Sequence, residues 1–190
     1  RRQRQMCIRD SLITIGIRND LVGKTTYEFP KPHDYKPVLR DVLLDCPEGP
    51  GVQYGEKKKK IFELVPAGGY WRDIDPEIAK EYMKSCWNME GGRTGILRRM
   101  SLDEPCLTVL TSPSQKQTER CHPLEARPFT VRENARCQMF PDEWEFCGTV
   151  ASQYKQVGNA VPVGLAFDVA KEIHKSLDNL DKAEVNLEEE

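Results

Sequence analysis

The clearest hydrophobic pattern in the chain lies near its C-terminus, where Leu165, Val169, Ile173 and Leu177 follow one another at every fourth position. This spacing predicts an amphipathic helix with one apolar stripe, and Pro162 stands where such a helix can begin. An apolar stripe of this kind has to be covered by another surface. The residues that follow, 179–190, are strongly acidic and predict a frayed or disordered tail.

Four shorter patterns predict further elements. The β-branched run at residues 12–17 ends in polar turn residues and predicts a buried strand whose partners come from elsewhere. Residues 38–44 suit a short helix after a proline-rich connection, and Asp75 followed by proline is typical of a helix start. Residues 130–139 suit a helix with Glu133 in its first turn.

Residues 47–120 have neither a helical nor a strand period, but they are dense in glycine, proline and aromatic residues. This composition predicts a small, loop-rich lobe. The lysine run at residues 57–60 could contact phosphate, although a solvated charge run is the more common explanation.

Composition limits the class of protein. The chain has 190 residues, of which 38% are hydrophobic and 31% charged, as in a globular domain. Neither a membrane-spanning apolar run nor a signal-like opening is found, which favours a cytoplasmic protein. The seven cysteines form no Cys-x-x-Cys pair and the histidines number three, so we expect reduced thiols and no metal site.

The first ten residues are predicted to have a different origin from the rest. Residues 1–10 back-translate into the transposase-end adapter of common sequencing libraries, and they show no apolar period. We therefore expect native sequence to begin near Leu12. Without the four arginines and one aspartate of this segment, the formal charge of −2 becomes −5. The competing interpretation is a basic arm that binds DNA.

Several motifs together resemble the DNA cytosine-5 methyltransferases. Residues 127–142 are similar to the ninth motif of this family, and residues 156–162, which include Gly-Asn-Ala-Val-Pro, are similar to the tenth. Residues 98–105, followed by Thr-Val at 108–109, resemble its target-recognition region, and residues 12–21 resemble the end of its eighth motif. The resemblance extends over nearly all of residues 12–178.

The resemblance implies an α/β fold. The chain would supply the C-terminal part of a doubly wound, Rossmann-like domain that depends on S-adenosylmethionine, together with a small target-recognition lobe. Residues 11–40 would form the end strand and a connection, and residues 41–122 the recognition lobe. Residues 123–178 would return to the catalytic domain, and residues 179–190 would form the tail.

The tenth motif carries the expected cofactor contacts. Gly158 permits a tight turn, Asn159 suits a left-handed turn, and Pro162 can begin the next helix. The resemblance implies that Asn159, Ala160 and Val161 close one side of the S-adenosylmethionine pocket. Without it, an ordinary capped turn would explain these residues equally well.

The ninth motif has a structural interpretation. The resemblance implies that its helix braces the recognition lobe against the larger domain through Arg132, Glu133 and Arg136. The alternative is an exposed helix with weak local ion pairs.

Target recognition is expected in the locally basic segment 91–136. Its candidate contacts to double-stranded DNA have side chains suited to phosphates or base edges, or belong to the Thr-Val pair of the resemblance. They are Arg98, Arg99, Thr108, Val109, Ser112, Gln115 and Lys116. Any one of them could equally be an ordinary surface residue.

No catalytic residue is expected in this chain. The family's nucleophile lies in a Pro-Cys pair, but Pro105-Cys106 lacks the flanking loop and lies in the recognition region, so we expect Cys106 to be a buried strand cysteine. The resemblance implies that the intact enzyme flips a cytosine from DNA and methylates its carbon 5 through a cysteine thiolate. An N-terminal half would supply that cysteine in cis or, alternatively, as a separate catalytic subunit. A further alternative is a non-catalytic DNA-binding module.

Overall fold

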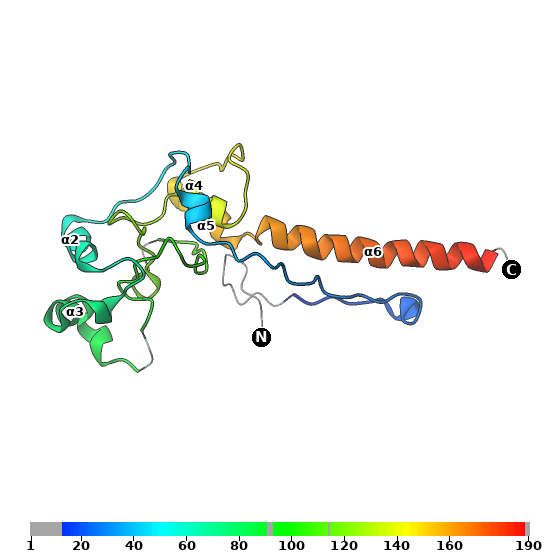
Figure 1. Cartoon of the computed structure of the whole chain (residues 1–190), viewed down its shortest axis with the longest axis horizontal. Helices are drawn as coiled ribbons and strands as arrows, with labels where there is room; N and C mark the ends of the chain where they lie inside the picture. Colours follow the sequence, from blue (N-terminus) through cyan, green and yellow to red (C-terminus); the bar gives the residue numbers. More distant parts are fainter. Residues whose placement is uncertain (1–12, 91–92, 114, 189–190) are drawn as a thin grey trace.

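The computed structural model describes residues 13–90, 93–113 and 115–188, so the expected adapter segment at residues 1–10 lies outside the described part. The chain is elongated (Figure 1): a lobe with helices α2 and α3 lies at one end, α4 and α5 lie in the middle, and α6 projects away from both. Within these described ranges, four 3-10 helices lie in the connections: η1 (Asn19–Leu21), η2 (Trp71–Asp73), η3 (Lys84–Asn88) and η4 (Lys116–Thr118).

The lobe is built on two short helices, α2 (Glu56–Leu64) and α3 (Pro76–Met83). The predicted start of α3 is confirmed, because the Asp75 carboxylate accepts hydrogen bonds from the N–H groups of Glu77 and Ile78. Helix α2 was not predicted. The core of the lobe is a cluster of buried residues contributed by both helices and by the loops around them: Phe62, Val65, Trp71, Ala79, Met83, Ile96, Leu97 and Cys121.

The lysine run forms most of the first two turns of α2. Lys58 points inward, and its Nζ lies 2.6 Å from a carboxylate oxygen of Glu119, which is fully buried. Lys58 also lies over the Tyr54 ring, 4.4 Å from its centroid. The other three lysines of the run are exposed. The run is therefore only partly a solvated charge run, because Lys58 joins α2 to the segment that follows η4.

A second core holds the middle of the molecule. Helix α4 (Val131–Cys137) packs against α1 (Arg40–Leu43) on one side and α5 (Val150–Asn159) on the other. The helices predicted at 38–44 and 130–139 are thereby confirmed. Buried residues of this cluster come from these helices, from the residues just before α1 and α4, and from residues 100–109: Leu39, Leu43, Met100, Cys106, Val109, Phe129, Val131, Ala135, Cys137, Tyr154 and Val157. Part of the expected recognition region thus packs against α4 and α5 and not inside the lobe.

The predicted strand at residues 12–17 is wrong for the part that the structure describes. Residues 13–17 belong to no strand, and the Ile17 side chain is exposed. Across the described ranges there is no named strand at all, but isolated bridges such as Arg99 with Cys121 occur. A strand needs hydrogen-bonding neighbours, and no described segment runs beside residues 13–17 as a ladder partner. The cysteine expected in a strand, Cys106, is buried but lies in an irregular segment.

Helix α6 (Val163–Glu188) confirms the helix predicted from the four-residue spacing, and Pro162 directly precedes it. The helix continues through most of the acidic segment, so the expectation of a frayed tail is wrong for residues 179–188. The apolar stripe is partly uncovered, since Ile173 is 37% and Leu177 52% exposed. The chain segment near residue 25 runs beside α6 (Figure 1), where Thr25 Oγ1 donates to the carbonyl of Ser176 at 2.7 Å.

Candidate cofactor and DNA site

Helix α4 begins with a complete capping box. The Thr130 hydroxyl accepts from the Glu133 N–H at 3.2 Å, and the Glu133 carboxylate accepts from the Thr130 N–H at 2.7 Å. The same carboxylate receives two hydrogen bonds from the Arg127 guanidinium, at 2.7 and 2.8 Å. Burial alone would raise the pKa of Glu133, but the bonds from Arg127 and Thr130 outweigh it and lower that pKa. Glu133 is therefore a buried anion that fixes the start of α4.

His122 lies on the other side of this carboxylate, at the expected boundary of the lobe. Its Nδ1 accepts from the N–H groups of Leu124 and Glu125, both at 3.2 Å, and its Nε2 lies 3.6 Å from Glu133 Oε1. Burial lowers the pKa of His122, and the nearby Glu133 only partly opposes this shift. Because Nδ1 is an acceptor, a neutral ring carries its proton on Nε2, facing the carboxylate.

Sequence reasoning missed the structural importance of His122 and counted Arg127 only as one of several basic residues. The Thr-x-x-Glu capping pattern was available from the sequence, but the two partners on the far side of Glu133 were not. Their placement depends on the turn at residues 122–127, where the His122 N–H donates to the Arg127 carbonyl at 2.8 Å.

Arg136 connects three segments that are distant in the sequence. Its guanidinium forms a two-bond pair with Asp142, at 2.6 and 2.9 Å, and also donates to Asp45 at 2.5 Å and to the Val42 carbonyl at 3.1 Å. These bonds join α4 to the end of α1 and to the loop after α4. The pKa of Arg136 is raised, chiefly by its hydrogen bonds to Asp142.

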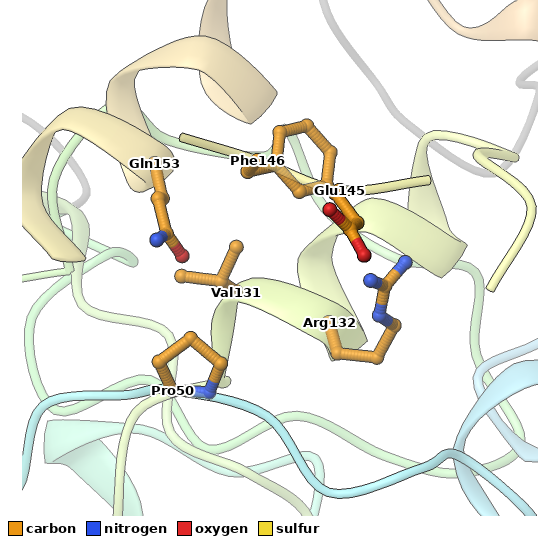
Figure 2. Close-up of a pocket in the computed structure, with 6 residues that line it drawn as sticks. All are labelled: Pro50, Val131, Arg132, Glu145, Phe146 and Gln153. Atoms are coloured by element: carbon orange, nitrogen blue, oxygen red, sulfur yellow. The ribbon is translucent and has the colours of Figure 1, made fainter. Parts of the chain in front are cut away.

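Arg132 holds the loop that connects α4 to α5. It donates to the carbonyls of Pro141 and Trp144, at 3.1 and 2.7 Å, and its guanidinium lies 5.9 Å from the Phe146 ring centroid. Figure 2 shows the small cleft beside this loop, with Arg132, Glu145 and Gln153 around it. The cleft has a volume of about 250 Å³, and Pro50, Val131 and Phe146 form its other walls.

The expected cofactor segment is an outward-facing connection between α5 and α6. Asn159 is the last residue of α5, and it is exposed, as is Val161. Ala160 has an extended backbone conformation, and Pro162 is buried. We call residues 159–161 the cofactor turn.

The expected conformation of this turn is wrong in one respect. Gly158 and Asn159 belong to α5, and neither has a positive φ. The structure requires glycine at position 158 because α5 approaches another backbone segment closely there, and not because the chain makes a left-handed turn. A Cβ on Gly158 would lie 2.5 Å from the Thr111 nitrogen and 2.6 Å from the Leu110 carbonyl atoms. The last turn of α5 thus presses directly on the backbone that follows the Thr108-Val109 pair.

The candidate DNA-contacting residues differ in how far their side chains are exposed. Gln115 is exposed and Ser112 half-buried, and the side chain of Lys116 lies outside the described part. The Arg98 side chain is 19% exposed and lies 3.3 Å from Glu104. Thr108 is half-buried.

Two of the candidates lie in structural positions. Val109 is buried in the core between α4 and α5, with 3% of its surface exposed. The Arg99 guanidinium donates to the carbonyls of Phe62, Val65 and Pro123, at 3.3, 3.0 and 3.2 Å. Because these donors already serve the lobe, the geometry argues against the DNA contact expected of Arg99 and favours a role in the fold.

The described ranges contain neither a membrane-spanning helix nor a metal-binding cluster. None of the helices found there is both long and apolar enough to cross a membrane. The same residues contain no group of three or more His, Cys, Asp or Glu side chains arranged to hold a metal ion.

Comparison with known proteins identifies the family. The model of the C-5 cytosine-specific DNA methylase family matches residues 8–175. The chain is 55% identical over 167 residues to the Type II methyltransferase M.Sau96I of Staphylococcus aureus, covering 87% of this chain and 39% of that protein. It is 49% identical over 181 residues to the Type II methyltransferase M.Eco47II of Escherichia coli, covering 92% of this chain and 43% of that protein.

The chain therefore belongs to the C-5 cytosine-specific DNA methylases, a family of methyltransferases that act on DNA. It spans about two-fifths of the length of the curated relatives that it matches. The family implies a methyltransferase fold, and the described residues contain helices and isolated bridges but no named strand.

Proposed function

We propose that this chain is the target-reading and cofactor-closing part of a DNA cytosine-5 methyltransferase that uses S-adenosylmethionine. The observation that carries the proposal is the cofactor turn, in which Asn159 and Val161 are exposed, which lies between α5 and α6, and which is part of the family match. The proposal concerns an intact enzyme in which an N-terminal half supplies the catalytic cysteine.

The residues of the cofactor turn fit a nucleoside-like ligand. The exposed Asn159 amide offers both a donor and acceptor, Ala160 has no bulk, and the exposed Val161 side chain gives an apolar contact. When bound, S-adenosylmethionine supplies the methyl group. The part of this chain is to hold one side of the molecule and to limit the access of water.

The uncovered apolar stripe of α6 supports the requirement for an N-terminal half. Leu177 and Ile173 remain exposed, and so does Phe167 on the same helix. Exposed apolar side chains of this size are costly in water, and such a surface is typical of one that another part of the protein covers. We therefore propose that the N-terminal half packs here, in cis in the intact enzyme.

For DNA we propose the surface around the exposed residues Gln115 and Gln117. Gln115 is exposed and accepts from the Thr118 hydroxyl through Oε1 at 3.0 Å, so its amide nitrogen is the group that we propose for base edges. We include Ser112 and Arg98 as further candidate contacts because of their residue types. Lys116 is proposed as a phosphate contact. Arg99 and Val109 are not included, because the first serves backbone carbonyls and the second is buried.

The test is a chimera in which residues 12–178 of this chain replace the matching C-terminal segment of M.Sau96I. The proposal expects the chimera to transfer labelled methyl groups from S-adenosylmethionine to carbon 5 of cytosine in DNA. It expects no transfer by residues 12–190 alone, because no catalytic cysteine motif is present. A folded but inactive chimera, or turnover by the isolated chain, would contradict the proposal.

A further inference from the structure

Gln138 is a buried polar residue to which the proposed function assigns no role. It directly follows α4, and its exposed fraction is 0%. Burying a side-chain amide is unfavourable unless its polar groups are hydrogen-bonded, so its partners indicate why it is there.

The partners of Gln138 lie on both sides of the cofactor turn. Its Nε2 donates to the Val157 carbonyl at 3.1 Å and to the Ala160 carbonyl at 3.2 Å. Its main-chain carbonyl accepts from the Val163 N–H, the first of α6, at 3.0 Å. Because both side-chain partners are acceptors, the amide nitrogen has to face the turn.

The hydrogen bonds of Gln138 serve backbone groups at the end of α5 and at the start of α6. The last carbonyls of an α-helix have no partner within the helix, and the first N–H groups of the next helix have none either. Gln138 satisfies groups at the end of α5 and at the start of α6 with one residue. Residues 159–161 are thereby held between two fixed points, although Gln138 itself does not reach the surface.

We infer that Gln138 is a positioning residue for the cofactor turn, holding Asn159 and its neighbours in the conformation that meets the methyl donor. The inference rests on the proposed function of that turn. Gln138 acts through the backbone and touches neither DNA nor the cofactor.

The substitution Gln138→Met separates positioning from folding. Methionine has a similar length and no branch, so it can fill the same space. Gln138 Oε1 is buried without a hydrogen-bond partner among the described residues, so the substitution also removes an unsatisfied acceptor. The bonds to Val157 and Ala160 are lost while much of the packing is kept.

The experiment measures the KM values for S-adenosylmethionine and for DNA in the chimera defined above. For Gln138→Met we expect the KM for S-adenosylmethionine to rise about tenfold, as for the loss of about 1.4 kcal/mol, and the KM for DNA to change by less than about twofold. The matched control is Gln153→Met on α5, which removes a bond from an amide to the Gly148 carbonyl at 3.1 Å. We expect both KM values of the control to stay unchanged.

The variant Gln138→Glu adds a pH signature. A protonated glutamic acid can donate to one of the two carbonyls, whereas the carboxylate repels both. Relative to the wild-type chimera, its KM for S-adenosylmethionine should therefore fall as the pH is lowered. If Gln138→Met does not fold, this pH dependence decides the question.

The two possible failures are distinguishable. An inactive wild-type chimera would overturn the proposed function and this inference together. If the wild-type chimera is active, the proposed function stands. The inference alone would then be overturned by a Gln138→Met variant whose KM for S-adenosylmethionine is unchanged, or whose two KM values rise equally. A folded Gln138→Glu variant with the pH dependence of the wild type would do the same.

Discussion

The substitution Gly158→Ala tests the contact between α5 and the backbone of Leu110 and Thr111. The added Cβ would lie 2.5 Å from the Thr111 nitrogen and 2.6 Å from the carbonyl carbon and oxygen of Leu110. All three are backbone atoms, so no flexible side chain can move aside. Relief of the overlap requires the two backbones to separate by about 1 Å, and overpacking of this kind costs about 1–3 kcal/mol.

The expected result is a lower thermal stability. For a chain of this size, a loss of about 2 kcal/mol lowers the Tm by about 6 °C. Thermal unfolding followed by circular dichroism on residues 12–190 measures this shift. The matched control is Gly16→Ala, because a Cβ at Gly16 would have no atom within 4 Å. A Tm of Gly158→Ala equal to that of the control would refute the close approach.

Three further predictions concern buried charges. Glu133→Gln leaves Arg127 without its buried anion and weakens the capping box. Urea unfolding should therefore give a free energy of unfolding lower by about 3 kcal/mol. A loss below about 0.5 kcal/mol would contradict a stabilising role of the bonds that Glu133 accepts from Arg127 and Thr130. Lys58→Met leaves Glu119 buried without its cation, so the free energy of unfolding should fall by a similar amount. Adding Glu119→Gln to this variant should restore part of that free energy. A double-mutant cycle with no coupling energy would contradict a stabilising ion pair between Lys58 and Glu119. The pKa of His122 is lowered from 6.5 on folding, so the unfolded chain binds its proton more tightly and the free energy of unfolding should decrease as the pH falls below about 6.5. Lowering of the Glu133 pKa from 4.5 adds a second loss below about pH 4.5, and a urea midpoint that did not fall on acidification would show that neither shift is present.

Local signals predicted α1, α3, α4 and α6, but not α2 or α5. Asp75 accepts the hydrogen bonds expected of a helix cap, and Thr130 and Glu133 form a capping box at the start of α4. These interactions span only a few residues, so the sequence contains all of the partners. The apolar spacing on α6 was equally local, but the acidic residues after it concealed that the helix continues to Glu188.

Long-range contacts could not be predicted in the same way. The β-branched run at 12–17 has strand propensity, yet a strand forms only beside a hydrogen-bonding neighbour. Four consecutive lysines obscured α2, whose stability depends on Phe62 in the core and on the ion pair of Lys58 with Glu119. Gly158 suggested a turn because its true neighbour, Leu110, is far away in the sequence.

The candidate site shows the same division. The motifs drew attention to residues 159–161, whose cofactor contact stays a prediction, but the bonds from Gln138 that anchor them are visible only in the structure. Arg99 has the residue type of a phosphate contact, and only its position shows that three backbone carbonyls use its donors.

The most direct test of the central claim is the affinity of the chimera for S-adenosylmethionine when Asn159 is replaced by alanine. If the cofactor turn forms one wall of the methyl-donor pocket, loss of the exposed amide should weaken binding about tenfold in calorimetry, while the affinity for DNA stays the same. Unchanged affinity for S-adenosylmethionine in a folded Asn159→Ala chimera would contradict the claim that this turn contacts the cofactor.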